Sequence, residues 1–204
     1  MKKYQKANKS KLVKKDIPLD TEVIIVNNTF GQFFYTSEKL ENDIDFTELT
    51  SFEKLTLQNL KDMRRDKKVI FSEYSILIVD VLDDEYSLKD VYAYLDLIEL
   101  YDELLFMVKS EDKFDVGMFE KFAVDSSIKE LKAVVSKMGK EGRTRLFQSL
   151  TQAYLARAIT LSKHSTYNKM TFMGDALNEE DVLGDLDYLK TGVGAPALDI
   201  RELL

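Results

Sequence analysis

The residue types that most often carry enzyme chemistry are scarce in this chain. There is no Cys, which excludes thiolate catalysis, a disulfide framework and cysteine-ligated metal sites. His164 is the only histidine, so a metal site that needs two histidines cannot be built within one chain. As a lone general base it would need one of the nearby carboxylates to orient its ring: Asp175, Glu179 or Glu180. No nucleophile motif stands beside His164, so we expect it to cap the end of a helix.

Two other patterns have a chemical and a simpler interpretation. A cluster of four acids resembles a magnesium site but, without paired acids elsewhere, is typical of an exposed turn: Asp80, Asp83, Asp84 and Glu85. The segment 139–144 contains the letters of a phosphate-binding loop, but its second glycine stands before Arg143 rather than before Lys-Ser/Thr. We therefore predict an inter-helix turn there. No cofactor and no small-molecule substrate are expected.

Basic residues give the clearest signal for binding. The net charge is −7, but the lysines before Asp16 contribute +7, so residues 16–204 carry −14. Such a block of like charge is typical of an interaction arm, and we predict that residues 1–16 form one. Its lysines are Lys2, Lys3, Lys6, Lys9, Lys11, Lys14 and Lys15. Arg143 and Arg145 are further candidates for contact with phosphate or with a partner's carboxylates.

Residues 17–82 are predicted to form a small α/β module. The β-branched run 23–26 and the aromatic run 32–35 are separated by turn formers, which predicts a hairpin. A short strand is expected at 44–46, and Thr56 is expected to cap a helix that continues to a basic cluster at 64–68. The runs 69–71 and 74–81 are predicted as strand, with the second at the centre of the sheet.

A helical bundle is predicted over residues 83–165. Ser87 with Asp90 forms a capping box, and apolar residues then recur at helical spacing, which predicts one long helix over about 87–108. Ser127 with Glu130 opens a second helix, which Gly139 should end. Further helices are expected near 116–124 and over about 143–163. The predicted fold class is therefore α+β, a β-rich module followed by a helical bundle, with an extended arm at each end.

Residues 166–204 are predicted to be mostly irregular. Residues 164–177 show no regular pattern, and Asn178 with Asp181 predicts a short acidic helix to about Leu189. Glycines and Pro196 then indicate an extended tail over 191–204. Its candidate partner-binding residues are Val193, Pro196, Leu198, Ile200, Leu203 and Leu204.

Two aromatic groups are candidate binding surfaces. The first would suit base stacking, but residues 22–38 contain no Lys or Arg, which favours packing in a core or an interface: Phe30, Phe33, Phe34 and Tyr35. The second lies among acids and fits either a protein interface or a bundle helix with an acidic outer face: Tyr92, Tyr94 and Tyr101.

The stretches 23–37, 55–63, 68–71 and 76–80 resemble a module of uncharacterised structural proteins of tailed bacteriophages. The resemblance covers residues 17–82 and the helices from 128 to 163. The resemblance implies a virion protein made in the host bacterial cytoplasm. The longest apolar stretches are far shorter than a membrane span, so no membrane-spanning segment is expected. The resemblance also implies other virion proteins as partners, in many copies of a symmetric assembly.

The first hypothesis is a non-enzymatic structural or assembly protein of the head, portal or head–tail connector, whose terminal arms bind neighbouring subunits. Deleting 1–16 or 191–204 is then expected to abolish incorporation into particles. The alternative is a phage regulatory or nucleic-acid-associated protein that acts on host machinery or packaged DNA through its lysine arm. An enzyme is the third hypothesis, without a reaction class.

Overall fold

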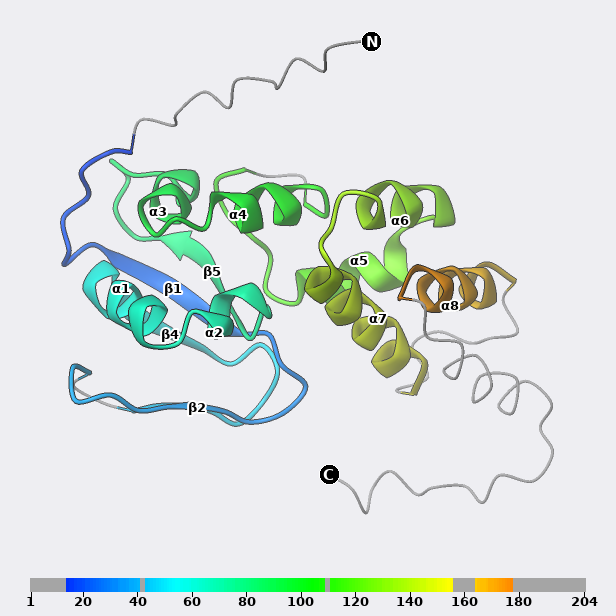
Figure 1. The fold of residues 1–204 in the computed structure, drawn as a ribbon, viewed down its shortest axis with the longest axis horizontal. Helices are drawn as coiled ribbons and strands as arrows, with labels where there is room; N and C mark the ends of the chain where they lie inside the picture. The colour runs from blue at the N-terminus through cyan, green and yellow to red at the C-terminus, as the bar shows by residue number, and fades with distance from the viewer. Residues whose placement is uncertain (1–13, 41–42, 109–110, 156–163, 178–204) are drawn as a thin grey trace, which may run out of the picture. The chain divides into compact units, whose positions relative to one another are not determined.

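The computed structural model describes residues 14–40, 43–108, 111–155 and 164–177. They form two compact units. Unit 1 comprises the described parts of residues 1–71, 75–105 and 109–116, and unit 2 those of 72–74, 106–108 and 117–204. The strands lie in unit 1, and unit 2 is helical (Figure 1). The fold class is α+β, as predicted, whereas residues 1–13 and the C-terminal tail lie outside the described residues.

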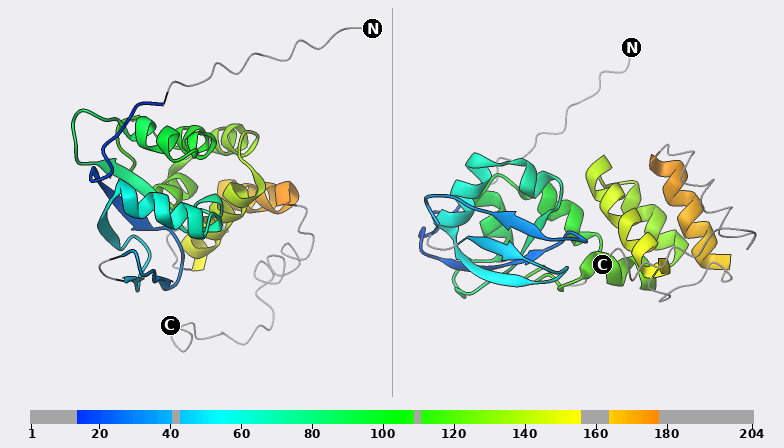
Figure 2. Two further views of the ribbon diagram at one scale, coloured as in Figure 1. Left: turned by 60° about the vertical axis from the view of Figure 1, so that its left-hand side comes forward. Right: turned by 90° about the horizontal axis from the view of Figure 1, so that it is seen from below.

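Unit 1 is built on a three-stranded antiparallel sheet. The strands β1 (Glu22–Asn27), β4 (Phe52–Thr56) and β5 (Ile76–Val81) lie in the order β4-β1-β5 (Figure 2). The prediction that β5 is the central strand is wrong, because the β-branched β1 takes that place. Val23 and Ile25 are fully buried, as expected of a strand paired on both sides.

The predicted hairpin between the first two strands is also wrong. The strand β2 (Phe33–Tyr35) pairs with β3 (Ile44–Phe46) in a separate two-stranded sheet. Asn27 holds the intervening loop open, because its side-chain amide donates to the carbonyl oxygens of Gly31 (3.1 Å) and Glu48 (2.8 Å). The chain therefore leaves β1 in a wide loop instead of a tight turn.

Two helices follow β4. The helix α1 (Leu57–Asp66) begins at the predicted cap, Thr56, which forms a reciprocal capping box with Asn59. The run 69–71, predicted as strand, belongs to the short helix α2 (Val69–Ser72), whose first turn closes through a bond from the Ile70 N–H to the Lys67 carbonyl oxygen. A three-residue apolar run fits strand and helix equally, so its pattern does not decide between them.

The predicted long helix over 87–108 is two helices, α3 (Leu88–Tyr94) and α4 (Ile98–Leu105), which Figure 1 shows as separate segments. Asp96 separates them with a left-handed backbone, φ 54°. The Leu97 N–H donates to the Tyr92 carbonyl oxygen, and the Asp96 N–H donates to the carbonyl oxygen of Ala93. These two bonds make a Schellman motif, in which Asp96 occupies the position that glycine usually takes.

Unit 1 continues beyond the predicted boundary at residue 82, because α3 packs on β5 and α4 packs on α3. The rings of Tyr92, Tyr101 and Phe114 form a buried cluster with centroid distances of 5.5–6.0 Å. The Tyr92 hydroxyl donates to the Ile78 carbonyl oxygen (2.9 Å) and accepts from its N–H (3.2 Å). A side chain of α3 therefore covers the outer edge of β5.

Unit 2 is a bundle of α5 (Met118–Asp125), α6 (Ile128–Val135), α7 (Lys140–Leu155) and α8 (His164–Leu177), gathered together in Figure 1. The predicted capping box of Ser127 with Glu130 is confirmed at the start of α6. The core contains buried side chains from all four helices: Phe119, Ala123, Leu131, Val135, Leu146, Leu150, Met170 and Met173.

Several predictions for unit 2 are corrected. Residues 140–144, predicted as part of a turn, are the first residues of α7. The helix begins at Lys140, three residues before the predicted start at 143. Residues 164–177, predicted as irregular, form α8, and His164 stands at the start of that helix instead of at a helix end. The predicted acidic helix over 178–189 lies outside the described residues.

Candidate functional site

An open hollow of about 420 Å³ lies on unit 1, where three segments distant in sequence meet. The segments are the base of the lysine arm, α1 and the bend between α3 and α4. We call it the basic hollow, and it is lined by Lys14, Lys15, Asp16, Lys61, Arg64, Tyr94, Leu95 and Asp96. Ile17, only 2% exposed, anchors the chain directly after the arm and so fixes where the arm begins.

Two of these cations lie on α1, and the packing of the helix on either side fixes their direction. Leu57, Leu60 and Met63 are fully buried and hold one side of the helix against the core. Lys61 and Arg64, three residues apart, therefore share a side next to the buried one. The capping box at Thr56 defines the first turn and with it the direction of both cations.

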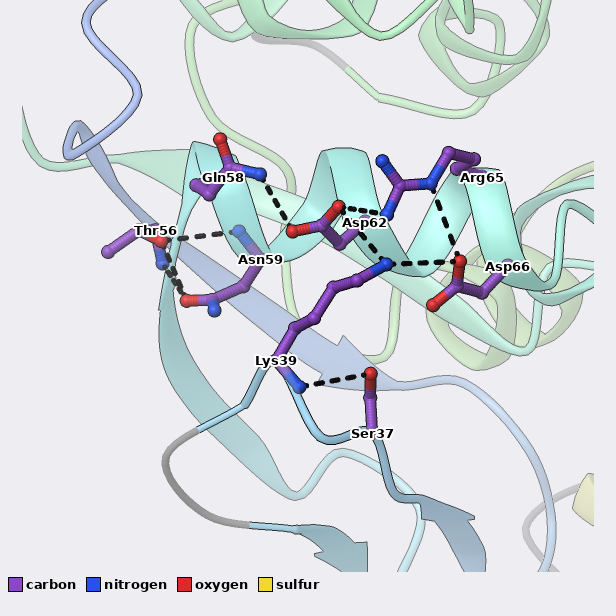
Figure 3. A network of polar contacts seen from close by, with 8 residues as sticks. All are labelled: Ser37, Lys39, Thr56, Gln58, Asn59, Asp62, Arg65 and Asp66. Carbon is purple, nitrogen blue, oxygen red and sulfur yellow. Dashed lines mark hydrogen bonds and ion pairs between the residues drawn. The ribbon is translucent and has the colours of Figure 1, made fainter.

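Another side of α1 is held by a polar network around the buried Asp62 (Figure 3). The Asp62 carboxylate accepts from the Gln58 amide at 2.7 Å and pairs with Arg65 at 2.6 Å. Lys39 reaches across from the segment after β2 and lies 3.8 Å from Asp62 and 3.6 Å from Asp66. The bond from Gln58 and the surrounding cations hold the pKa of Asp62 below its ordinary value, against the effect of desolvation.

Asp96 pairs with two of the cations that line the basic hollow. Lys14 donates to its carboxylate, and Arg64 lies 3.7 Å from it. The bond from Lys14 lowers the pKa of Asp96, and the cations of Arg64 and Lys68 add to this effect against partial desolvation. The side chains of Lys14 and Asp96 are 47% and 57% exposed, so this ion pair stands in water. Such exposed pairs are weak and exchange partners readily.

The second lysine of the arm base pairs with the start of α3. The Lys15 ammonium lies 2.7 Å from the Asp90 carboxylate, which also accepts from the Ser87 N–H at 3.0 Å as part of the capping box. Desolvation opposes the charge on Asp90, but the bonds from Lys15 and Ser87 outweigh it and lower the pKa. The base of the arm therefore contacts both the first turn of α3, at Asp90, and the bend that follows the helix, at Asp96.

The basic hollow holds more cations than anions. Its lining contributes four cations and two carboxylates. The Lys61 ammonium lies 5.7 Å from the ring centroid of Tyr94, a cation–π contact, and forms no ion pair within the described part of the chain. Residues 16–116 contain ten Lys and Arg, and five of them lie in 61–68. The basic hollow thus adjoins the main basic stretch of an otherwise acidic unit.

The two arginines predicted to contact partners are engaged within unit 2 instead. Arg145 is only 4% exposed, and its guanidinium pairs with Glu120 at 2.6 Å and donates to Ser149. The Arg143 Nε donates to the carbonyl oxygens of Val135 (3.1 Å) and Met138 (3.0 Å), at the end of α6. Both arginines lie on α7, and the sequence alone does not show which side of that helix faces the other helices. The structure shows that both side chains bond within unit 2.

The structure brings only two of the predicted partner-binding lysines to the site, Lys14 and Lys15. The other five, Lys2 to Lys11, and the tail residues 193–204 lie outside the described residues. Lys61 and Arg64 were missed as site residues, although the sequence shows a basic cluster at 64–68, whereas Tyr94 belongs to one of the two aromatic groups that the sequence singled out. Among the described residues, no group of three His, Asp or Glu is placed to hold a metal ion, and Asp80 pairs with Lys113.

A scan of the chain against protein-family models and searches of curated proteins and of solved structures found no match. Function is therefore inferred from the residues and their geometry. In the part of the chain that the structure describes, no helix is long and apolar enough to cross a membrane.

Proposed function

We propose that this chain is a non-enzymatic structural or assembly protein of a bacteriophage virion, associated with the head, portal or head–tail connector. It binds neighbouring subunits in a symmetric assembly, and its terminal arms take part in this binding. The sequence resemblance supports the virion setting. The structural support is a free sheet edge with an exposed aromatic residue, on the strand β4.

The outer edge of β4 is available for pairing. The Asn27 N–H donates to the Ser51 carbonyl oxygen and the Leu57 N–H to that of Thr21, so alternate residues of β4 face β1. The backbone groups of Phe52 and Lys54 therefore point away from the sheet. Among the described residues, no strand pairs with this side of β4. An unpaired edge is a template for a strand from another chain.

The Phe52 side chain supports the same interpretation. It is 69% exposed, the largest value among the exposed large hydrophobic residues of the described chain. The other sheet edge, along β5, is covered by Tyr92, so the two edges are treated differently. An aromatic residue beside an open edge supplies both main-chain bonds and apolar contact to a neighbouring subunit.

The test replaces Phe52 in the infecting phage. Phe52→Ser should sharply lower the amount of the chain in assembled particles and leave the melting temperature of the isolated protein within a few degrees of wild type. Phe34→Ser is the matched control, because Phe34 is also exposed, at 54%, but lies on β2. Normal incorporation of Phe52→Ser, or an equal reduction in both variants, would count against the proposal.

A further inference from the structure

We propose that the basic hollow binds the phosphate backbone of a nucleic acid through the four cations of its lining, Lys14, Lys15, Lys61 and Arg64. This inference goes beyond the proposed function and does not depend on it, because its tests change Lys61, Arg64 and Asp96, none of which lies on β4 or in a terminal arm. The ligand is recognised by charge, so the site reads phosphates and not base sequence.

The cations of the basic hollow come from elements that the fold fixes independently. Lys61 and Arg64 project from α1, whose opposite side is held by the network around Asp62. Lys14 and Lys15 are placed by the buried Ile17 directly after them. A preformed group of cations binds phosphates without first having to order a loop.

The surroundings of the basic hollow favour a nucleic acid over an acidic protein. Protein interfaces depend on apolar and aromatic anchors that become buried. None of the exposed large hydrophobic residues of the described chain lines the hollow: Leu19, Phe34, Phe52, Val69, Leu82, Phe106 and Val116. Of the two apolar or aromatic residues that do line it, Leu95 is already buried, and the partly buried ring of Tyr94 lies against the Lys61 ammonium.

The acids of the site do not prevent phosphate binding. Asp96 pairs with Lys14 in an exposed position, and a phosphate can replace that carboxylate as the partner of the lysine. Residues 16–116 carry a net charge of −14. Repulsion from this acidic surface disfavours other placements of the strand and restricts it to the basic hollow.

The first experiment measures binding of labelled single-stranded and duplex DNA to the full-length chain at several salt concentrations. The double variant Lys61→Ala/Arg64→Ala should bind more weakly than wild type. The slope of log K against log salt should become shallower by about 0.7 (single strand) or about 0.9 (duplex) for each phosphate that the variant no longer neutralises. The form of DNA, single-stranded or duplex, whose binding the double variant weakens more is the form that the basic hollow binds.

The control for this experiment removes the same charge elsewhere on unit 1. Lys54→Ala/Lys113→Ala deletes two exposed cations that pair with Glu22 and Asp80 outside the basic hollow. The control should keep the wild-type salt slope. An equal change of slope in both double variants would show a diffuse charge effect and overturn the site.

A third variant should change binding in the opposite direction. Asp96→Asn keeps a residue that tolerates the left-handed backbone but removes the carboxylate that engages Lys14 and Arg64. Binding should become tighter and its salt slope steeper, which loss of folding cannot imitate. Unchanged or weaker binding by a folded Asp96→Asn variant contradicts the proposal.

A polyglutamate peptide of equal charge serves as the competitor. It should displace the DNA only at a much higher concentration of charge. Displacement by polyglutamate as effective as by unlabelled DNA would assign the hollow to an acidic protein and overturn the nucleic-acid proposal. Because particle assembly plays no part in these assays, their failure leaves the proposed role of β4 to its own test.

Discussion

At Gly142 the fold leaves little room for a side chain. A Cβ there would lie 2.8 Å from the terminal methyl carbon of Met138 and 2.9 Å from the Tyr74 hydroxyl oxygen. Tyr74 is buried and its ring packs edge-on against Phe119, with the centroids 5.6 Å apart, so it cannot move without disturbing the core of unit 2. The glycine in the segment that resembles a phosphate loop is therefore explained by packing.

Replacing Gly142 tests this explanation. Gly142→Ala should lower the free energy of unfolding by about 1–2 kcal/mol, because overpacking outweighs the better helix propensity of alanine, worth about 1 kcal/mol. Chemical denaturation followed by circular dichroism measures the change. Gly31→Ala is the control, since a Cβ at Gly31 meets nothing within 4 Å, and its effect should be close to zero. A stabilised Gly142→Ala variant would contradict the packing account.

Asp62 makes the stability of unit 1 dependent on pH. Its pKa in the folded protein is lowered from 3.8, first by the bond from Gln58. A carboxyl group with a lowered pKa stabilises the fold at pH values above 3.8, and this stabilisation disappears as the pH falls through the lower, folded-state pKa. Gln58→Ala should lower the free energy of unfolding at neutral pH but leave it unchanged below the folded-state pKa, so the loss of stability between about pH 5 and pH 2, measured by denaturation, should become smaller. An unchanged dependence of stability on pH in this range would show that the hydrogen bond between Gln58 and Asp62 contributes little to stability.

The sequence predicted individual residues well where the interaction is local. The three caps at Thr56, Ser87 and Ser127 join residues three positions apart, so they can be found by spacing alone. The role of Arg145 depends on Glu120, 25 positions away on another helix, and no local pattern indicates that pairing. The basic hollow was missed for the same reason, since its lining comes from three distant segments.

At the scale of elements, one edge of the main sheet is covered by other groups, and the other edge is uncovered among the described residues. The edge of β5 is closed by the Tyr92 hydroxyl and by the Phe114 N–H, which donates to the Val79 carbonyl oxygen. Covering an edge in this way prevents unwanted pairing with other chains. The edge of β4 carries no such cover among the described residues, which is why we assign assembly contacts to it.

Removing one oxygen atom tests the closure of β5. Tyr92→Phe should lower the free energy of unfolding by about 1–3 kcal/mol, because the buried N–H and carbonyl groups of Ile78 would then have no hydroxyl to bond. Tyr94→Phe, at a less buried ring on the same helix, should have almost no effect. Thermal and chemical unfolding of both variants measure the difference. Equal stability of Tyr92→Phe and wild type would mean that another group covers this edge.

The existence of most elements could be predicted, but their pairing could not. Seven of the predicted segments are strands or helices close to the expected bounds, because apolar periodicity is a local property: 23–26, 32–35, 44–46, the helix after Thr56, 74–81, 116–124 and the helix after Ser127. The partner of each strand depends on the path of the loops, and here one side chain, Asn27, redirects the chain after β1. The break at Asp96 was hidden because the apolar pattern continues through it.

On the scale of the whole molecule, charge is distributed very unevenly. The lysines before Asp16 contribute +7, residues 16–116 carry −14, and residues 117–204 are neutral. In the described structure the last two lysines of the arm pair with acids of unit 1. The lysines at the base of the arm are therefore complementary in charge to acids of unit 1.

The central proposal, a structural role in the virion, is tested most directly by the protein content of purified phage particles. Quantitative mass spectrometry should find this chain in intact, nuclease-treated particles at a fixed ratio to the other virion proteins, in a number of copies that matches a symmetric ring or shell. A chain that is abundant in infected cells but missing from the particles would contradict a structural role in the virion.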